Sequence, residues 1–138
     1  MKIIILGGDG FCGWASSLRL ANKGHDVFIF DNLSRRKIDK ELKTKSLTPI
    51  KSIYKRVETW NKINKNKIKF FKIDVAKEFL RLEKLIKKIN PHTIVHFAEQ
   101  RSAPYSMISL KTRNYTLNNN IITNNNILYI IAKLNKKI

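Results

Sequence analysis

The chain has 138 residues, of which 43% are hydrophobic, enough for one domain with a buried core and too few for two ordinary domains. Lys and Arg outnumber Asp and Glu by 28 to 10, and the formal net charge of +18 would attract nucleic acid or an anionic membrane surface. The basic residues are spread along the whole chain in Lys-, Asn- and Ile-rich stretches, however. This favours a drifted surface composition over a dedicated polyanion site, so we expect neither a nucleic-acid partner nor a membrane partner.

Other features of the whole sequence further narrow the class of protein. No hydrophobic run approaches the roughly 18 to 20 residues that a membrane helix needs, and no signal-peptide cleavage site follows the N-terminus. The lone Cys12 excludes an internal disulfide and suits a reducing compartment, so we expect a cytoplasmic protein. The histidines at positions 25, 92 and 96 lack metal-ligand spacing, so we expect no metal site.

The N-terminal segment has the pattern of a strand, a helix and a second strand. Residues 2–6 form an apolar run that ends in glycine, which is typical of a buried parallel strand. From Gly10 apolar residues recur at helical spacing as far as Lys23-Gly24, a basic last turn followed by a C-terminal glycine. Residues 26–30 form a second strand that ends at Asp31. We therefore predict one βαβ unit.

The next connection, residues 32–66, is longer than usual. It is predicted to begin as a basic loop over Arg35–Lys45. Thr48-Pro49 then has the pattern of an N-cap and first helical position. A helix is predicted to follow, because one apolar face is formed by Ile50, Ile53, Val57 and Trp60.

The rest of the chain alternates strands and helices. Strands are predicted over residues 68–73, ending at Asp74, and over residues 93–97. Between them a helix over residues 79–89 should stop at Asn90-Pro91, because the residue before a proline disfavours helix. Residues 105 to about 134 are predicted to be largely helical, although asparagine clusters weaken the pattern.

This order of elements predicts an α/β protein with the N-terminal half of a Rossmann-type, doubly wound parallel sheet. The expected strand order is 3-2-1-4. In such a sheet the ligand crevice lies at the carboxyl ends of strands 1 and 4, where the order reverses. The motifs described next all fall at the carboxyl end of a predicted strand.

A glycine triplet follows the first predicted strand and opens the first predicted helix. Gly7 permits a tight turn, Gly10 lets the backbone approach a pyrophosphate, and Gly13 lets the helix pack close to the sheet. The helix N-terminus would offer unpaired N–H groups and a positive dipole end to phosphates. No Gly-Lys-Ser/Thr ending follows, which excludes a P-loop. We therefore predict dinucleotide binding.

Two aspartates at strand ends are candidate cofactor ligands. Asp31 lies 18 residues beyond Gly13, where a carboxylate commonly takes the ribose hydroxyls; a capping Asp at a strand end is the alternative. Arg35 and Arg36 would suit the 2′-phosphate of NADP, but Asp31 would repel that phosphate, so we predict NAD. Asp74 is placed to reach the adenine amino group, and a turn-forming Asp is the alternative.

For two further residues we favour a role that uses no side-chain chemistry. Cys12 lies at a helix N-terminus, where a thiolate would be stabilised, but no general base is close in sequence. We interpret it as a backbone donor to the phosphates. His96 on an apolar strand is interpreted as a hydrogen-bonded core histidine rather than a ligand.

Four stretches together resemble a known family. The chain is similar to the extended short-chain dehydrogenase/reductase family of nucleotide-sugar enzymes, the NAD-dependent epimerases and dehydratases, and within it to the branch that makes UDP-sulfoquinovose for sulfolipid biosynthesis. The resemblance covers nearly the whole chain. The segments that carry it are Gly7–Trp14, Asp31–Arg36, Ser46–Ile50 and, most specifically, His96–Met107.

The resemblance implies a reaction in which bound NAD⁺ takes a hydride from C4 of the glucose in UDP-glucose, the sugar loses water, sulfite adds at C6, and the hydride returns. Arg101 would lie between cofactor and substrate and contact both, and neighbouring Asn120 is an alternative to Asn119 on the last helix. The implied cofactor contacts are Phe11 and Cys12 at the pyrophosphate, Asp31, Asn32, Leu33, Ser34 and Arg35 on the adenosine side, Asp74 at the adenine, and Asn119. Other nucleotide-sugar 4-epimerases or dehydratases are the close alternative, and a non-catalytic basic Rossmann-like module that binds polyanions is the alternative of another class.

The sequence departs from the family pattern in two places. Thr123-Asn124 stands where the family usually has Gly-Thr. The family's catalytic Thr and Tyr-x-x-x-Lys pair lie farther along than position 138, and we expect no substitute for them here. We therefore expect residues 1–138 to be an incomplete NAD-binding Rossmann domain without turnover of its own, the C-terminal catalytic and UDP-sugar-binding part being absent. A homodimer is expected for the full-length enzyme rather than for this chain.

Overall fold

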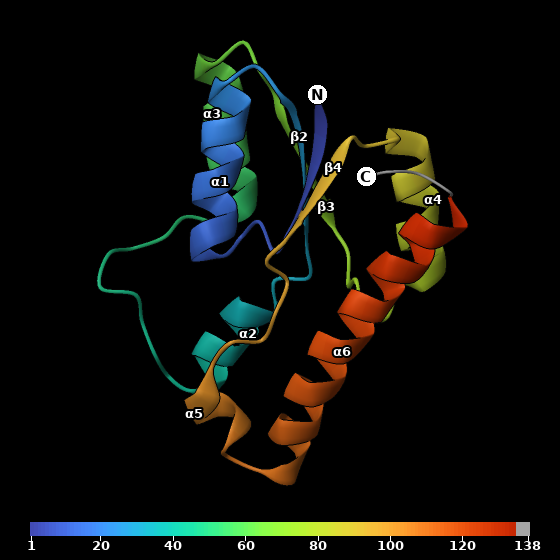
Figure 1. Ribbon diagram of the computed structural model, residues 1–138. Helices are drawn as coiled ribbons and strands as arrows, with labels where there is room; N and C mark the ends of the chain where they lie inside the picture. Colours follow the sequence, from blue (N-terminus) through green and yellow to red (C-terminus); the bar gives the residue numbers. More distant parts are fainter. Residues whose placement is uncertain (135–138) are drawn as a thin grey trace.

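A computed structural model of the chain describes residues 1–134 and contains one parallel sheet (Figure 1). The sheet order is β3-β2-β1-β4, and each neighbouring pair is parallel. The predicted Rossmann-type fold class and strand order are confirmed. All four strands end at the same edge of the sheet, where the connecting segments gather. The strands are β1 (Lys2–Leu6), β2 (Asp26–Asp31), β3 (Ile68–Lys72) and β4 (Thr93–His96).

Helices cover both faces of the sheet, which explains why the central strands are apolar on both sides. Figure 1 shows α1 (Phe11–Asn22) and α3 (Ile53–Ile63) on one face, and α4 (Phe79–Ile89) and α6 (Leu110–Lys133) on the other. The buried strand residues on the α1 and α3 side are Ile3, Ile5, Val27, Ile29 and Ile68. Those on the α4 and α6 side are Ile4, Leu6, Phe28 and Phe30.

The predicted basic loop over Arg35–Lys45 is wrong in its first half, because Ser34–Glu41 forms helix α2. The chain turns sharply before it at Leu33, whose φ is 61°, and the Asn32 side chain accepts a hydrogen bond from the Ser34 amide at 2.9 Å. Lys, Arg and Glu are good helix formers, but α2 has a single apolar residue, Ile38, so it lacks the amphipathic periodicity on which the prediction relied.

The helix predicted from Thr48-Pro49 begins later, at Ile53. The hydroxyl of Ser52 accepts a hydrogen bond from the Lys55 amide at 3.3 Å and supplies the N-cap. Ile53 is fully buried, whereas Ile50 is exposed and does not belong to the apolar face. The later start, at the Ser52 cap, places the apolar face of the helix against the sheet.

The helical region predicted from residue 105 onward consists of two helices. The short α5 (Ala103–Ser106) ends before Ser109, which caps α6 together with Thr112 in a reciprocal pair of hydrogen bonds. The asparagine clusters do not break α6, which continues for 24 residues. Thr123-Asn124 is also accommodated, because buried Thr123 donates from its hydroxyl to the Asn119 carbonyl at 2.6 Å.

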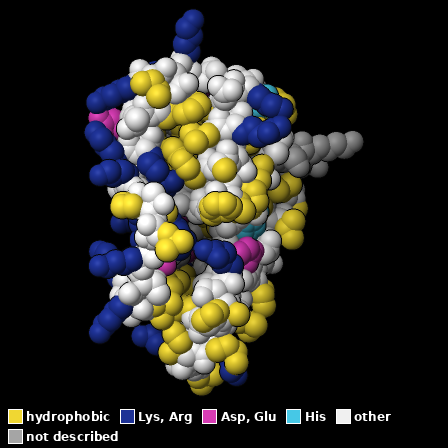
Figure 2. Space-filling view, turned by 90° about the vertical axis from the view of Figure 1, so that its left-hand side faces the viewer, with side chains coloured by type: hydrophobic (Ala, Val, Ile, Leu, Met, Phe, Trp, Pro, Cys, Tyr) yellow, Lys and Arg dark blue, Asp and Glu magenta, His cyan; other side chains and the backbone are white. Residues whose placement is uncertain are grey.

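Basic side chains dominate the surface charge without forming one patch on the face that Figure 2 shows. There Lys and Arg side chains are dispersed, with hydrophobic and uncharged atoms between them. Within residues 1–134 no helix is both long and apolar enough to cross a membrane, and no cluster of potential metal ligands is found.

Candidate functional site

The glycine turn lies where β1 ends and packs tightly against its neighbours. Gly7 has a φ of +78°, and its amide donates to the carbonyl of Phe30 at 2.8 Å. A Cβ added at Gly13 would stand 2.2 Å from the carbonyl oxygen of Gly7. A Cβ at Gly10 would meet that same oxygen at 3.1 Å and nothing else within 4 Å. Gly13 therefore brings helix and turn together, whereas Gly10 presents an open backbone.

Helix α1 begins at this turn, and the backbone amides of its first residues lack hydrogen-bond partners in the part of the chain that the structure describes. No side chain caps the helix, and within residues 1–134 the amides of Phe11 and Cys12 have no hydrogen-bond partner. Both residues are exposed. Free N–H groups at a helix N-terminus, beside an open glycine, suit phosphate oxygens both in geometry and in sign of the dipole. These residues therefore fit the pyrophosphate of a dinucleotide.

The carboxylate of Asp31 organises the neighbouring turns. It accepts hydrogen bonds from the amide of Asp9 at 2.9 Å and from the amide of Leu33 at 2.7 Å. Burial raises the pKa of Asp31 above its usual value, although these two backbone donors oppose that rise. These contacts are those expected of a capping Asp at a strand end, the alternative for Asp31, and the same side chain also lines the pocket described below.

Asp74 is engaged in a similar way after β3. One oxygen accepts a hydrogen bond from the Asn32 amide group at 3.0 Å, and the other accepts from the backbone amides of Ala76 and Lys77 at 3.1 Å each. Asp74 therefore does form the turn after β3, which was the alternative that the sequence left open for it. The bond to Asn32 also joins the loop after β3 to the loop after β2.

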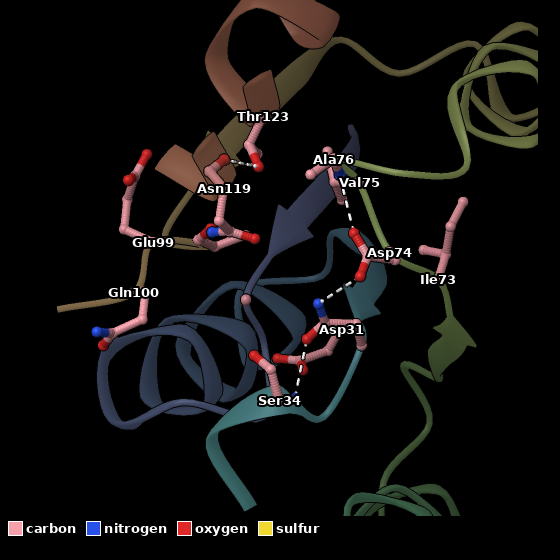
Figure 3. A pocket seen from close by; sticks show the side chains of 13 residues that line it. Asp31, Ser34, Ile73, Asp74, Val75, Ala76, Glu99, Gln100, Asn119 and Thr123 are labelled. Atoms are coloured by element: carbon pink, nitrogen blue, oxygen red, sulfur yellow. Dashed lines mark hydrogen bonds between the residues drawn. The ribbon is translucent and has the colours of Figure 1, made fainter. Parts of the chain in front are cut away.

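A pocket opens at the carboxyl ends of the strands, where the loops after β1, β2, β3 and β4 meet the middle of α6 (Figure 3). Of the predicted cofactor residues it is lined by Gly7, Asp31, Asn32, Ser34, Asp74 and Asn119. The lining also includes residues that we did not predict, namely Ile73, Val75, Ala76, Ala98, Glu99, Gln100 and Thr123. The predicted residues outside the lining are Gly10, Phe11, Cys12, Gly13, Leu33, Arg35 and Arg101.

The structure gives the two candidate asparagines on α6 different roles. The amide group of Asn119 faces the pocket and lies 3.5 Å from the Ala98 carbonyl and 3.1 Å from the side chain of Asn120. Asn120 instead holds the backbone of Gln100, accepting from its amide at 2.9 Å and donating to its carbonyl at 3.1 Å. Asn119 is thus the one with access to a ligand, and Asn120 fixes the segment after β4.

Three predicted residues have other surroundings. The side chain of Leu33 packs against the core on the α1 side, and its backbone amide donates to Asp31 at 2.7 Å. Arg35 points its guanidinium at the carbonyl of Asp9, at 3.5 Å. Arg101 is exposed, and within residues 1–134 no hydrogen bond or ion pair joins its side chain to another residue.

His96 ends β4 as a partly buried and hydrogen-bonded histidine, in agreement with its interpretation as a structural residue. Its Nδ1 accepts a hydrogen bond from the Ala98 amide at 3.0 Å, and its Nε2 lies 3.5 Å from Glu99. Burial lowers the pKa of His96 below its usual value, and the negative charge of Glu99 opposes this shift.

The spacing Tyr-x-x-x-Lys does occur within the chain, at Tyr129 and Lys133. The structure places both near the end of α6, outside the pocket lining: the ring of Tyr129 packs on Phe79, and Lys133 pairs with Glu83 at 2.8 Å. The spacing is therefore part of a packed helix end and does not form a catalytic pair at the site.

Sequence reasoning missed two groups that hold the site together. The amide group of buried Asn126 on α6 donates to the carbonyls of Val75 and Ala76, at 2.9 and 3.1 Å, and so fixes the loop after β3. Asp9, inside the glycine turn, is 2% exposed and forms ion pairs with Arg36 and Arg56. A carboxylate among glycines, where a turn needs none, was the available signal for the second group.

Comparison with known proteins places the chain in a family. The sequence profile of the NAD-dependent epimerase/dehydratase family matches residues 3–138. The chloroplastic UDP-sulfoquinovose synthase of Spinacia oleracea is 43% identical over 136 residues, which are 99% of this chain and 28% of that protein. The UDP-sulfoquinovose synthase of Sulfolobus acidocaldarius is 36% identical over 138 residues, which are 100% of this chain and 35% of that protein. The chain thus spans about a third of the length of these relatives.

Solved structures agree on the fold. UDP-glucose 4-epimerase from Bifidobacterium longum, solved with NAD⁺ and UDP, matches with a TM-score of 0.73 at 21% identity, covering 98% of this chain and 34% of that one. The UDP-Glc/GlcNAc 4-epimerase of Campylobacter jejuni matches with a TM-score of 0.72 at 22% identity, covering 96% and 33%. With the family profile matching almost every residue, the chain belongs to the NAD-dependent epimerase/dehydratase family, whose cofactor is NAD.

Proposed function

We propose that this chain binds NAD across the carboxyl edge of its sheet and is the cofactor-binding part of an enzyme that makes UDP-sulfoquinovose from UDP-glucose and sulfite. The observation that carries the cofactor proposal is the meeting of an open glycine, free helix-terminal amides and the Asp31 carboxylate at one edge. The choice of reaction is supported by two relatives, 43% and 36% identical, that bear the name UDP-sulfoquinovose synthase.

The chain's own residues have distinct tasks in this proposal. The backbone at Gly7, Gly10 and Gly13 and the amides of Phe11 and Cys12 hold the pyrophosphate. Asp31 accepts hydrogen bonds from the adenosine ribose, and its charge disfavours a 2′-phosphate. The remaining adenosine contacts are assigned to Asn32, Leu33, Ser34 and Arg35, the adenine to Asp74, and the other half of the cofactor to Asn119 and Arg101.

Bound NAD would supply reversible hydride transfer at C4 of the sugar. Arg101 would contact both cofactor and sugar nucleotide, since a guanidinium can bind phosphate, sulfite or sugar hydroxyls in a forked geometry. We assign no catalytic acid, base or nucleophile to residues 1–138, and we propose that the 138-residue chain alone has no turnover. The homodimer of the full-length enzyme and a cytoplasmic location belong to the proposal as well; the spinach relative is chloroplastic by name.

A nucleotide-sugar 4-epimerase is the second candidate, because the two structural neighbours described above carry that title. Those neighbours are 21% and 22% identical, however, against 43% for the spinach sulfoquinovose synthase. A polyanion-binding module remains the candidate of another class on the strength of the +18 charge. The dispersed basic side chains in Figure 2 favour it less than a single basic patch would.

The cofactor proposal is tested by calorimetric titration of the 138-residue chain with NAD. We expect saturable binding that largely persists between about 50 and 200 mM salt, a range over which the Debye length falls by about half. Binding to DNA that falls linearly with log salt, together with no binding of NAD, would instead support the polyanion module.

The reaction is tested in a chimera in which this chain replaces the matching 28% of the spinach enzyme. The chimera is expected to convert UDP-glucose and sulfite to UDP-sulfoquinovose. Conversion of UDP-glucose to UDP-galactose as the main product, with no sulfite incorporation, would favour the epimerase candidate.

A further inference from the structure

Asp9 is a buried carboxylate inside the glycine turn, and two arginines from other elements converge on it. Arg36 of α2 donates to both carboxylate oxygens, at 2.7 and 2.9 Å. Arg56 of α3 donates to one of those oxygens and lies 3.4 Å from the Asp9 carbonyl. Asp9 is 2% exposed, and a carboxylate so placed would be costly to bury without these partners.

Both guanidinium groups are fixed in place by additional contacts. Arg36 also donates to the carbonyl of Lys51 at 3.0 Å. Arg56 lies over the ring of Trp14, with 4.5 Å from its central carbon to the ring centroid. The hydrogen bond to Asp9 raises the pKa of Arg36, whereas burial, together with the neighbouring positive charges, lowers the pKa of Arg56. The Asp9 carboxylate thus offsets part of the cost of burying the Arg56 guanidinium.

This cluster adjoins the proposed ribose site. The amide of Asp9 donates to Asp31 at 2.9 Å, and Arg35 lies 3.5 Å from the carbonyl of Asp9. Three guanidinium groups therefore contact Asp9, whose backbone amide is bonded to the Asp31 carboxylate that we assign to the ribose. Arg36 would suit a 2′-phosphate if its guanidinium were free, but in this structure it is paired with Asp9.

We propose that Asp9 is a second residue that selects NAD over NADP. It holds Arg36 and Arg56 in ion pairs, so that they do not pair with a 2′-phosphate, while Asp31 repels that phosphate directly. The inference rests on the proposed NAD site. It predicts that removing the charge of Asp31 alone leaves part of the preference for NAD over NADP in place, because the two arginines remain bound to Asp9.

The test compares the wild-type chain with Asp31→Asn, Asp9→Asn and the double variant, each titrated with NAD and NADP at the same salt concentration. The readout is the ratio of the two affinities. We expect the ratio to move toward NADP in Asp31→Asn, and to move by about a further tenfold in the double variant, as expected for one charge-assisted hydrogen bond gained by the 2′-phosphate. A purely structural clamp would weaken both cofactors alike and leave the ratio unchanged.

Lys40→Ala in the double variant is the matched control, because it removes a positive charge from the exposed face of α2. It should leave the ratio unaltered, whereas Arg36→Ala in that background should reduce the gain in NADP affinity, with Arg56 still released. A double variant with the same ratio of affinities as Asp31→Asn would overturn the proposal. The proposal would also be overturned if Lys40→Ala lowered the NADP affinity of the double variant as much as Arg36→Ala does.

A further comparison covers the case in which replacing Asp9 prevents folding. In the Asp31→Asn background, Arg36→Ala should leave NADP affinity unchanged if Asp9 holds the arginine, and a tenfold loss would overturn the proposal. Failure of the proposed function is distinguishable, since the wild-type chain would then bind neither NAD nor NADP.

Discussion

Replacing Gly13 by Ala should destabilise the fold, although an alanine is normally favoured in a helix. The substitution gains about 1 kcal/mol in helix propensity. The new Cβ, however, would stand 2.2 Å from the Gly7 carbonyl oxygen and 2.8 Å from the Cα of Gly8, both backbone atoms that no rotamer change can move away. Overpacking typically costs about 1 to 3 kcal/mol, and contacts this short belong at the top of that range. We expect a net loss of about 2 kcal/mol.

Gly10→Ala is the matched control from the same turn. Gly10 has a φ of −72°, which alanine adopts readily, and its Cβ would meet the Gly7 oxygen at 3.1 Å and nothing else within 4 Å. Its stability should change by less than about 1 kcal/mol. Nucleotide binding should nevertheless fall by about tenfold or more, because a methyl group would stand where we place the pyrophosphate.

The two variants are compared by urea unfolding followed by circular dichroism, and by titration with NAD. The expected pattern is a lower unfolding midpoint for Gly13→Ala and a nearly unchanged midpoint with weak binding for Gly10→Ala. A Gly13→Ala chain as stable as the wild type would refute the packing argument, and a Gly10→Ala chain with wild-type affinity would refute the placement of the phosphates.

Three other predictions concern residues already described. Asn126→Leu should lower the free energy of unfolding by about 2 kcal/mol, because it leaves two loop carbonyls without donors, and a wild-type value in urea unfolding would contradict this. Because burial lowers the pKa of His96 in the folded state, the unfolded chain binds the proton more readily, so stability should be full above the unfolded value of about 6.5 and fall as the pH drops through it. His96→Asn should flatten this dependence in unfolding curves taken from pH 7.5 to 5, whereas His25→Asn should not. In the chimera with the spinach enzyme, Arg101→Lys should keep NAD binding but lower turnover by about ten- to hundredfold, and an unchanged rate would remove Arg101 from the site.

Much of the fold was predictable because it depends on local patterns. The apolar runs of β1 and β2, the glycine turn between β1 and α1, and the Asn90-Pro91 stop of α4 each carry their own signal in a few residues. Helix α2 was not predictable in the same way, since its periodicity is weak. Two of its arginines bond to Asp9, a partner in a different part of the sequence.

The candidate site was predictable where a residue follows a strand directly. Asp31 and Asp74 were found by position, and both line the pocket. The contributions of Asp9 and Asn126 were not, because they act by holding backbone or side-chain partners from other elements. Contacts between residues 9 and 56, or 126 and 75, depend on the packing of whole layers, and no local pattern in the sequence encodes them.

The position of β1 in the sheet has a consequence for how the chain acquires its structure during synthesis. β1 is central: one edge pairs with β2, which is complete at residue 31, and the other pairs with β4, which ends 65 residues later. At about 5 to 20 residues per second, a ribosome needs about 3 to 13 s to produce that second partner. For this interval the apolar Ile3, Ile4 and Ile5 present an unpaired strand edge, the kind of segment on which nascent chains aggregate. Slower translation between β2 and β4 should therefore lower the yield of soluble chain, and a chaperone that shields this edge should restore it.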